Sequence, residues 1–120
     1  MRIGLDVMGG DFAPEVTIKG ALLSLDELPH DVQLVLIGDE AFLTTKLSDL
    51  NIPPGRIETV YSSEVIESGE KPLKAISKKQ NSSIVIGLRM LRKGEIDAFS
   101  SAGNSGAMLV GSMYSVGPIK

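Results

Sequence analysis

The residues best suited to chemistry lie near the C-terminal end of the chain, where small and glycine residues follow a short apolar segment. The segment reads Asp97-Ala98-Phe99-Ser100-Ser101-Ala102-Gly103-Asn104-Ser105-Gly106-Ala107, and an apolar stretch runs on to Met113. This order predicts a strand, a tight turn and a helix whose first backbone amides are not covered by bulky side chains. Free amides at the positive end of a helix dipole can bind an anion. The alternative is an ordinary glycine turn.

A second segment of the same kind opens the chain. The run Ile3 to Val7 is typical of a buried strand, it carries Asp6 near its end, and the pair Gly9-Gly10 follows. Pro14 and Glu15 then predict a helix start, since proline fits the first turn and a carboxylate suits the dipole there. Neither turn has the G-x-G-x-x-G or G-K-[ST] pattern, so no dinucleotide cofactor and no P-loop are expected. The groups offered by both turns suit one small anion better.

A cluster of lysines is the third candidate. Lys71, Lys74 and Lys78 are spaced by three and four residues, so a helix would carry all three on one face, with Lys79 beside them. In a net-acidic chain such a cluster could attract a phosphate or an acidic partner. The alternative is a solvated helix face.

Composition excludes several classes of function. The chain has 120 residues, no cysteine, a single histidine and a net charge of −3. Because the chain has no excess of lysine and arginine, nucleic-acid binding is not expected. The lone His30 lies in a turn, so a histidine metal site or a Ser-His-Asp triad is not expected either. Asp6, Asp11 and Glu15 could form an acidic metal cluster, but turn and cap roles explain them equally well. Cysteine-free composition and the absence of a bilayer-length apolar run favour a cytoplasmic protein.

Alternating apolar patterns predict strands separated by helices. The predicted strands cover residues 3–7, 32–37, 57–61 and 96–99. Five helices are predicted. The first covers residues 14–28, the second carries the stripe of Leu43, Leu47 and Leu50, and the third covers residues 72–79. The fourth begins at a cap formed by Ser82 or Ser83, and the fifth covers the apolar stretch 107–113. Pro53-Pro54 and Gly117-Pro118 predict the ends of the second and last helices.

This order predicts an α/β fold, with a mostly parallel sheet and helices on both faces. In such sheets ligands bind beyond the carboxyl ends of the strands. Both glycine turns leave strands at that edge, so we expect them to converge on one crevice.

The residues also resemble a known family. Three blocks of the sequence are similar to blocks of the bacterial PlsX phosphate acyltransferases. They are Arg2-Ile3-Gly4-Leu5-Asp6-Val7-Met8-Gly9-Gly10-Asp11 with Ala13-Pro14-Glu15, the basic segment from Lys71-Pro72 to Ser82-Ser83, and Ser101 to Ala107. Val7 and Ser105 replace the family's usual alanine and threonine, and Ser77 and Gln80 stand where basic residues are frequent. Family members also run well beyond Lys120, so residues 1–120 resemble the N-terminal part of a single α/β catalytic domain.

The resemblance implies transfer of a fatty acyl group from acyl carrier protein to inorganic phosphate, giving acyl phosphate for phospholipid synthesis. It implies a Rossmann-like three-layer fold similar to phosphotransacetylases and to isocitrate and isopropylmalate dehydrogenases. It also implies a homodimer, with peripheral association at the inner face of the membrane. The residues expected in catalysis are Asn104, Ser105, Lys71 and Lys74. Those expected to bind substrate are Gly9, Gly10, Gly103, Gly106, Lys78, Lys79 and Ser82.

Two other functions fit the same residues. One is a non-catalytic α/β module that binds phosphate or a nucleotide. The other is a short-chain phosphotransacetylase that uses coenzyme A.

Overall fold

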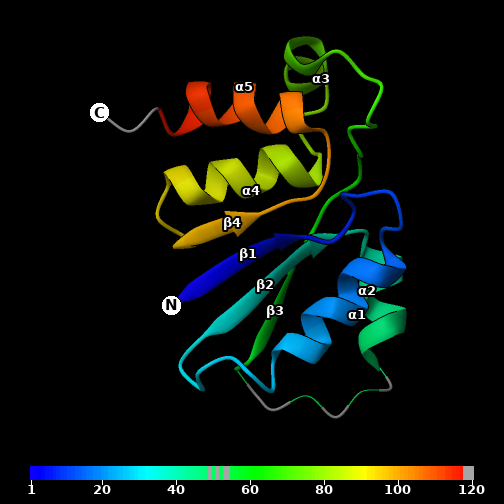
Figure 1. The fold of residues 1–120 in the computed structure, drawn as a ribbon, viewed down its shortest axis with the longest axis vertical. Coiled ribbons are helices and arrows are strands. Elements are labelled where there is room, and N and C mark those ends of the chain that lie inside the picture. The colour runs from blue at the N-terminus through cyan, green and yellow to red at the C-terminus, as the bar shows by residue number, and fades with distance from the viewer. Residues whose placement is uncertain (49, 51, 53–54, 118–120) are drawn as a thin grey trace.

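A computed structural model describes residues 1–48, 50, 52 and 55–117 of the chain (Figure 1). Parallel strands alternate with helices along the described residues. The strands are β1 (Arg2–Asp6), β2 (Gln33–Gly38), β3 (Ile57–Tyr61) and β4 (Ala98–Ser100). The helices are α1 (Glu15–Ser24), α2 (Glu40–Ser48), α3 (Pro72–Lys78), α4 (Ser83–Arg92) and α5 (Ser105–Ser115).

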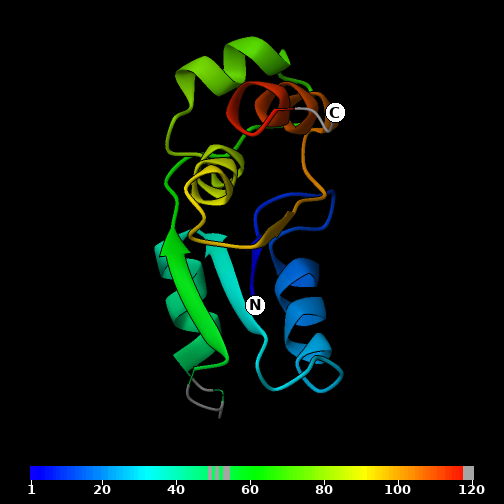
Figure 2. The same ribbon diagram turned by 90° about the vertical axis from the view of Figure 1, so that its left-hand side faces the viewer.

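The strands form one sheet in the order β3-β2-β1-β4, and every pairing is parallel. Helices α1 and α2 cover one face, and α4 packs on the other, against β1, β2 and β4. Helix α5 packs on α4 and α3 packs on α5, so these helices stack outward from the sheet (Figure 2). The predicted α/β fold with helices on both faces of a parallel sheet is therefore confirmed.

Strand β2 is the centre of the core. Its continuous apolar run predicted burial on both faces, and the structure confirms this. Leu34 and Leu36 pack with α1 and α2, while Val35 and Ile37 pack with α4. Because side chains alternate between the two faces of a strand, one apolar run supplies both halves of the core.

Most element boundaries differ from the prediction by one or two residues, and the end of α1 differs by four. Helix α1 ends at Ser24, and not at residue 28 as predicted. At this end the Ser24 hydroxyl donates to the Ala21 carbonyl, and the following residues form turns. The last strand is regular only from Ala98 to Ser100, because just before it the Arg2 amide of β1 donates to the Asp97 side chain at 2.7 Å instead of to a backbone carbonyl. The helix stops predicted at Pro53-Pro54 and Pro118 lie outside the described residues.

The ends of α4 follow the sequence closely. The Ser82 hydroxyl accepts a hydrogen bond from the Val85 amide at 3.3 Å, so Ser82 is the N-cap. Gly94 takes a positive φ of 74° just after the helix, as expected for a C-terminal glycine. Across the described residues, the helices are all too short or too polar to cross a membrane.

Candidate functional site

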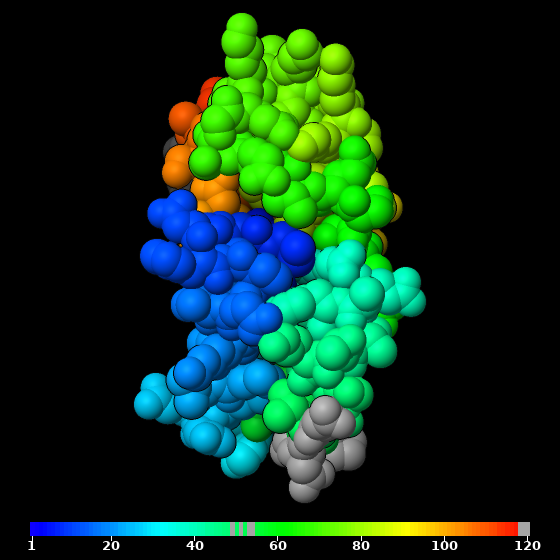
Figure 3. All heavy atoms as spheres, turned by 90° about the vertical axis from the view of Figure 1, so that its right-hand side faces the viewer, coloured from blue at the N-terminus to red at the C-terminus, as the bar shows by residue number. Residues whose placement is uncertain are grey.

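The two glycine turns converge at the carboxyl ends of β1 and β4, as predicted. They line a crevice of about 440 Å³ together with a third segment, the loop at residues 65–68. The first turn contributes residues 8–11 and the second contributes residues 102–105. Seen from the side on which the strands end, the blue N-terminal segment lies directly beside the orange start of α5 (Figure 3).

The two turns touch at Gly9. A Cβ atom at this position would lie 2.5 Å from Asp6 Oδ2 and 2.7 Å from the backbone nitrogen of Gly103. Real Cβ atoms essentially never approach other atoms so closely. Glycine is therefore required at position 9 by close packing of one turn against the other. Its neighbour Gly10 is exposed and takes a positive φ of 111°.

Asp6 lies beneath both turns and is only 1% exposed. Its Oδ1 accepts a hydrogen bond from the Met8 amide at 2.9 Å, which agrees with the expectation that this residue shapes the first turn. Its Oδ2 accepts a hydrogen bond from the Ser101 hydroxyl at 2.7 Å. A buried carboxylate needs such donors, because burial without them is costly.

Asn104 caps α5 and ties it to the 65–70 region. Its Oδ1 accepts from the Ala107 amide at 2.9 Å. Its Nδ2 donates to the carbonyl of Glu67 at 2.9 Å and to that of Glu70 at 3.1 Å. Both polar atoms of the Asn104 side chain are thus hydrogen-bonded to other groups of the protein. The predicted contact with phosphate or an oxyanion stays a prediction.

The start of α5 leaves backbone amides available to a ligand. Gly103 donates its amide to the Ser101 hydroxyl at 3.1 Å, so that amide is occupied. Among the described residues, the amides of Ser105 and Gly106 have no hydrogen-bond acceptor. Two free amides at the positive end of an 11-residue helix favour negative charge at this point.

The lysines line a separate cavity of about 390 Å³ on α3. Its lining residues are Glu70, Lys71, Lys74, Ala75, Lys78 and Lys79. The predicted sharing of one face is therefore confirmed. Lys71, Lys74 and Lys78 are exposed, and within the described part of the chain none of them has an ion-pair partner.

Lys79 differs from its neighbours because its half-buried side chain is bound by other groups of the protein. It donates to the Val65 carbonyl at 2.6 Å and forms an ion pair with Glu70. The hydrogen bond from Lys79 lowers the pKa of Glu70 below its usual value of 4.5. The stabilisation from this pair is therefore complete above pH 4.5 and is lost as the pH falls through the lowered pKa. Contacts of Lys79 with substrate stay a prediction.

The lysine cavity adjoins the start of α5. A Cβ atom at Gly106 would lie 2.4 Å from Pro72 Cγ, so the first turns of α3 and α5 are in contact. Lys71 immediately precedes that proline. The crevice itself is lined by the carboxylates Asp11 and Glu67, and no lysine from the described residues lines it. Of the predicted site residues, Gly9, Gly10, Gly103, Asn104 and Ser105 line the crevice and the four lysines line the second cavity, while Gly106 lies between α5 and α3.

Comparison with known proteins identifies the family. A family model described as "Fatty acid synthesis protein" matches residues 1–120. The chain is 48% identical over its whole length to a phosphate acyltransferase of Caldanaerobacter subterraneus subsp. tengcongensis and 47% identical to one of Thermoanaerobacter pseudethanolicus, covering 35% of each relative. A phosphate acyltransferase of Halothermothrix orenii is 43% identical over 117 residues, again 35% of its length.

The chain belongs to the PlsX phosphate acyltransferase family. It spans about a third of the length of these relatives.

One wall of the crevice in this PlsX chain was missed from the sequence. No residue between 62 and 70 was expected at the site, yet Val65 to Ser68 line the crevice. Ile66 anchors the loop, because it is 5% exposed and packs with Ala75, Ile84 and Ala107. The apolar pair Val65-Ile66 inside a polar segment was the available signal.

Ser82 lies at neither cavity of this PlsX chain. Its side chain is fully buried and serves as the N-cap of α4, so its predicted contact with substrate stays a prediction.

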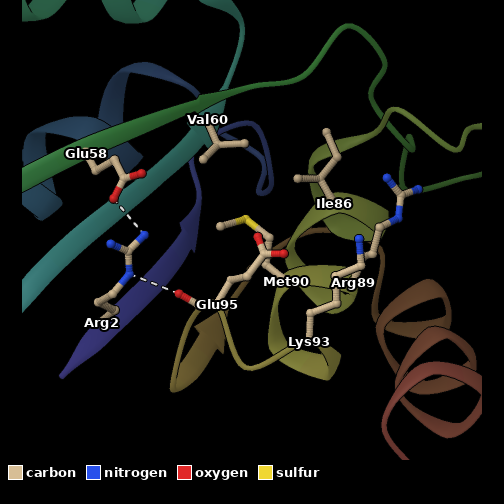
Figure 4. Close-up of a pocket in the computed structure, with 8 residues that line it drawn as sticks. All are labelled: Arg2, Glu58, Val60, Ile86, Arg89, Met90, Lys93 and Glu95. Carbon is tan, nitrogen blue, oxygen red and sulfur yellow. Dashed lines mark hydrogen bonds and ion pairs between the residues drawn. The ribbon is translucent and has the colours of Figure 1, made fainter.

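A further cavity in the PlsX chain, of about 620 Å³, lies near the amino end of β1 (Figure 4). Its apolar floor is formed by Val60, Ile86 and Met90. At its rim Arg2 forms an ion pair with Glu58 at 2.6 Å. No sequence pattern predicted this cavity. Among the described residues, no three carboxylate or imidazole side chains are grouped closely enough to hold a metal ion.

Proposed function

We propose that the full-length protein transfers a fatty acyl group from the thioester of acyl carrier protein to inorganic phosphate. The products are acyl phosphate, for phospholipid synthesis, and the free carrier thiol. The observation that carries the proposal is the pair of free amides at Ser105 and Gly106, at a helix start where Ser105 lines the crevice built by both glycine turns. The name of the relatives, phosphate acyltransferase, supports the same reaction.

The reaction needs little covalent help from the protein. A phosphate oxygen attacks the thioester carbonyl carbon, and the carbonyl oxygen becomes an oxyanion. When the C–O double bond re-forms, the C–S bond breaks and sulfur leaves as a thiolate, which then takes a proton from solvent. Phosphate is an adequate nucleophile and a thiolate is a good leaving group. The tasks left to the protein are positioning and stabilisation of the developing negative charge.

The start of α5 is suited to both tasks. The amides of Ser105 and Gly106 and the Ser105 hydroxyl would hold phosphate or the oxyanion, with Asn104 fixing the turn from which they project. Gly9, Gly10 and Gly103 would let substrate approach the backbone closely. No covalent serine intermediate is included, because the chain's single histidine, His30, lies in a turn far along the chain from Ser105.

Positive charge at the site would come from the lysines on α3. The carboxylates of Asp11 and Glu67 at the crevice oppose an incoming anion. Lys71 and Lys74 would offset them and neutralise phosphate, and with Lys78 and Lys79 they would attract the acidic carrier protein.

A product assay tests the proposal directly. Long-chain acyl carrier protein and phosphate should give acyl phosphate, trapped with hydroxylamine as the hydroxamate, in amounts equal to the thiol released. Thiol release at the same rate without phosphate would contradict the proposal, because water would then be the acceptor. Faster turnover of acetyl-coenzyme A than of the carrier thioester would favour a short-chain phosphotransacetylase, and no turnover of either would favour a binding module.

Removing a lysine charge should affect function more than stability. Lys71→Ala and Lys74→Ala should each lower kcat/KM by about ten- to a hundredfold, as expected for loss of a charge-assisted hydrogen bond. The free energy of unfolding should change by at most about 0.5 kcal/mol, because both side chains are exposed.

Lys19→Ala is the matched control for these variants, because Lys19 is an exposed lysine on α1 outside both cavities. Added salt should reduce the advantage of the wild type if the lysines steer the carrier protein. If Lys71→Ala and Lys74→Ala both keep wild-type kinetics at low salt, the lysines of α3 form only a solvated helix face without a role in the reaction.

The proposal extends to the whole protein. Residues 1–120 would be the N-terminal part of one catalytic domain, and the complete enzyme would be a cytoplasmic homodimer that associates peripherally with the inner face of the membrane. Size measurement and vesicle co-sedimentation of the full-length protein test these two points separately.

A further inference from the structure

A chain of hydrogen bonds joins the two glycine turns beneath the crevice. The Gly103 amide donates to the Ser101 hydroxyl oxygen at 3.1 Å, and the Ser101 hydroxyl donates to Asp6 Oδ2 at 2.7 Å. The other carboxylate oxygen accepts from the Met8 amide at 2.9 Å. These hydrogen bonds therefore link residues 95 positions apart, from the end of β1 to the turn before α5.

The direction of each bond in this chain is determined by its donors. A carboxylate can only accept, so the single hydroxyl proton of Ser101 must point toward Asp6. The Ser101 oxygen then offers its lone pairs to the Gly103 amide. Hydrogen bonds to a carboxylate are stronger than bonds between neutral groups, and bonds in a chain strengthen one another.

The same hydrogen bonds also affect which backbone amides remain available to a ligand. Because the Gly103 amide is bound to Ser101, it is not available to a ligand, whereas the amides of Ser105 and Gly106 have no acceptor among the described residues. Asp6 Oδ2 lies 2.5 Å from the position that a Cβ of Gly9 would occupy. A shift of the carboxylate would therefore displace both walls of the crevice.

We propose that Asp6 and Ser101 are positioning residues that hold the two glycine turns in register, so that substrates in the crevice meet the amides of Ser105 and Gly106. This proposal rests on the proposed function. Neither residue is assigned contact with substrate. Their effect on the reaction is exerted through the geometry of the turns that they join.

The test uses Ser101→Ala and Ser101→Thr in the full-length protein. Ser101→Ala should lower kcat for phosphate-dependent acyl transfer by about ten- to a hundredfold, from the loss of a hydrogen bond to a charged group. The KM for the carrier thioester should change less than about threefold, because the carrier is attracted by the α3 lysines. Ser101→Thr keeps the hydroxyl and should restore most of the rate.

Ser100→Ala is the matched control, because Ser100 is exposed on β4 and its hydroxyl has no hydrogen-bond partner among the described residues. Asp6→Asn should impair the rate as Ser101→Ala does. The double variant should be little worse than Asp6→Asn alone, because both changes break the same chain. Amide hydrogen exchange at Gly103 should be faster in Ser101→Ala than in the wild type.

The outcomes separate the two proposals. If the wild type releases thiol only with phosphate and folded Ser101→Ala matches its kcat, the positioning role alone is overturned. The same holds if Ser101→Thr is as slow as Ser101→Ala, or if the two changes are simply additive. If the wild type shows no phosphate-dependent release, the proposed function is overturned and the positioning role falls with it.

Discussion

Residues 1–120 by themselves are expected to show no acyl transfer above the uncatalysed background. Strand β4 is an edge of the sheet with only three paired residues, so one side of the crevice has no neighbouring strand. Helix α5 exposes large apolar side chains, which in longer proteins are normally covered. These side chains are Leu109, Met113, Tyr114 and Val116. Groups that complete the site are therefore expected from the part of the relatives' length that this chain does not span.

The measurement compares thiol release by equal concentrations of the 120-residue chain and the full-length protein. Circular dichroism of the shorter chain is the control, because an unfolded chain would be inactive for a trivial reason. Turnover of the folded short chain close to that of the full-length protein would show that the active site has been misplaced. It would also show that the crevice between the glycine turns is complete.

Gly9→Ala is expected to lower kcat/KM by about a hundredfold, the loss that a misplacement of about 1 Å can cause. The new methyl group would lie 2.5 Å from Asp6 Oδ2 and 2.7 Å from the Gly103 nitrogen, so one turn must move. The nearest obstacles are a buried carboxylate and backbone, which cannot swing aside as the end of a flexible side chain can. Overpacking of this kind should also lower the free energy of unfolding by about 1–3 kcal/mol.

Gly20→Ala is the control for this variant. Gly20 lies in α1 with no atom within 4 Å of its added Cβ, so alanine there should stabilise the helix by about 0.5–1 kcal/mol and leave kinetics unchanged. Kinetic assays and denaturant unfolding of both variants give the comparison. Equal kinetics in Gly9→Ala and Gly20→Ala would mean that contact between the two turns is irrelevant to the reaction.

Local patterns in the sequence were sufficient to predict most elements. The continuous apolar run of β2 predicted its burial on both faces, and the lysine spacing predicted the shared face on α3. Ser82 and Gly94 marked the ends of α4 through backbone preferences that depend only on neighbouring residues. Since parallel strands place their carboxyl ends at one edge, convergence of the two glycine turns followed from the order of elements alone.

Boundaries were less well predicted, because they depend on which backbone groups find partners. The last turns of α1 and the start of β4 show this: their apolar residues do lie in the core, but the regular hydrogen bonding stops earlier or begins later than the apolar pattern. Hydrophobic periodicity reports burial and does not report hydrogen bonding.

The sequence by itself thus determined the α/β class, the family and the edge at which the crevice lies. Only the tertiary structure decided what each polar side chain contacts. Asp6 accepts from Ser101, 95 positions away, and Lys79 donates to groups 9 and 14 positions away. The Asn104 Nδ2 group donates to carbonyls 34 to 37 positions away, so no local pattern could have predicted these partners of Asp6 and Asn104. A buried polar group takes whichever donor or acceptor the packed chain brings within reach, and that depends on how distant segments meet.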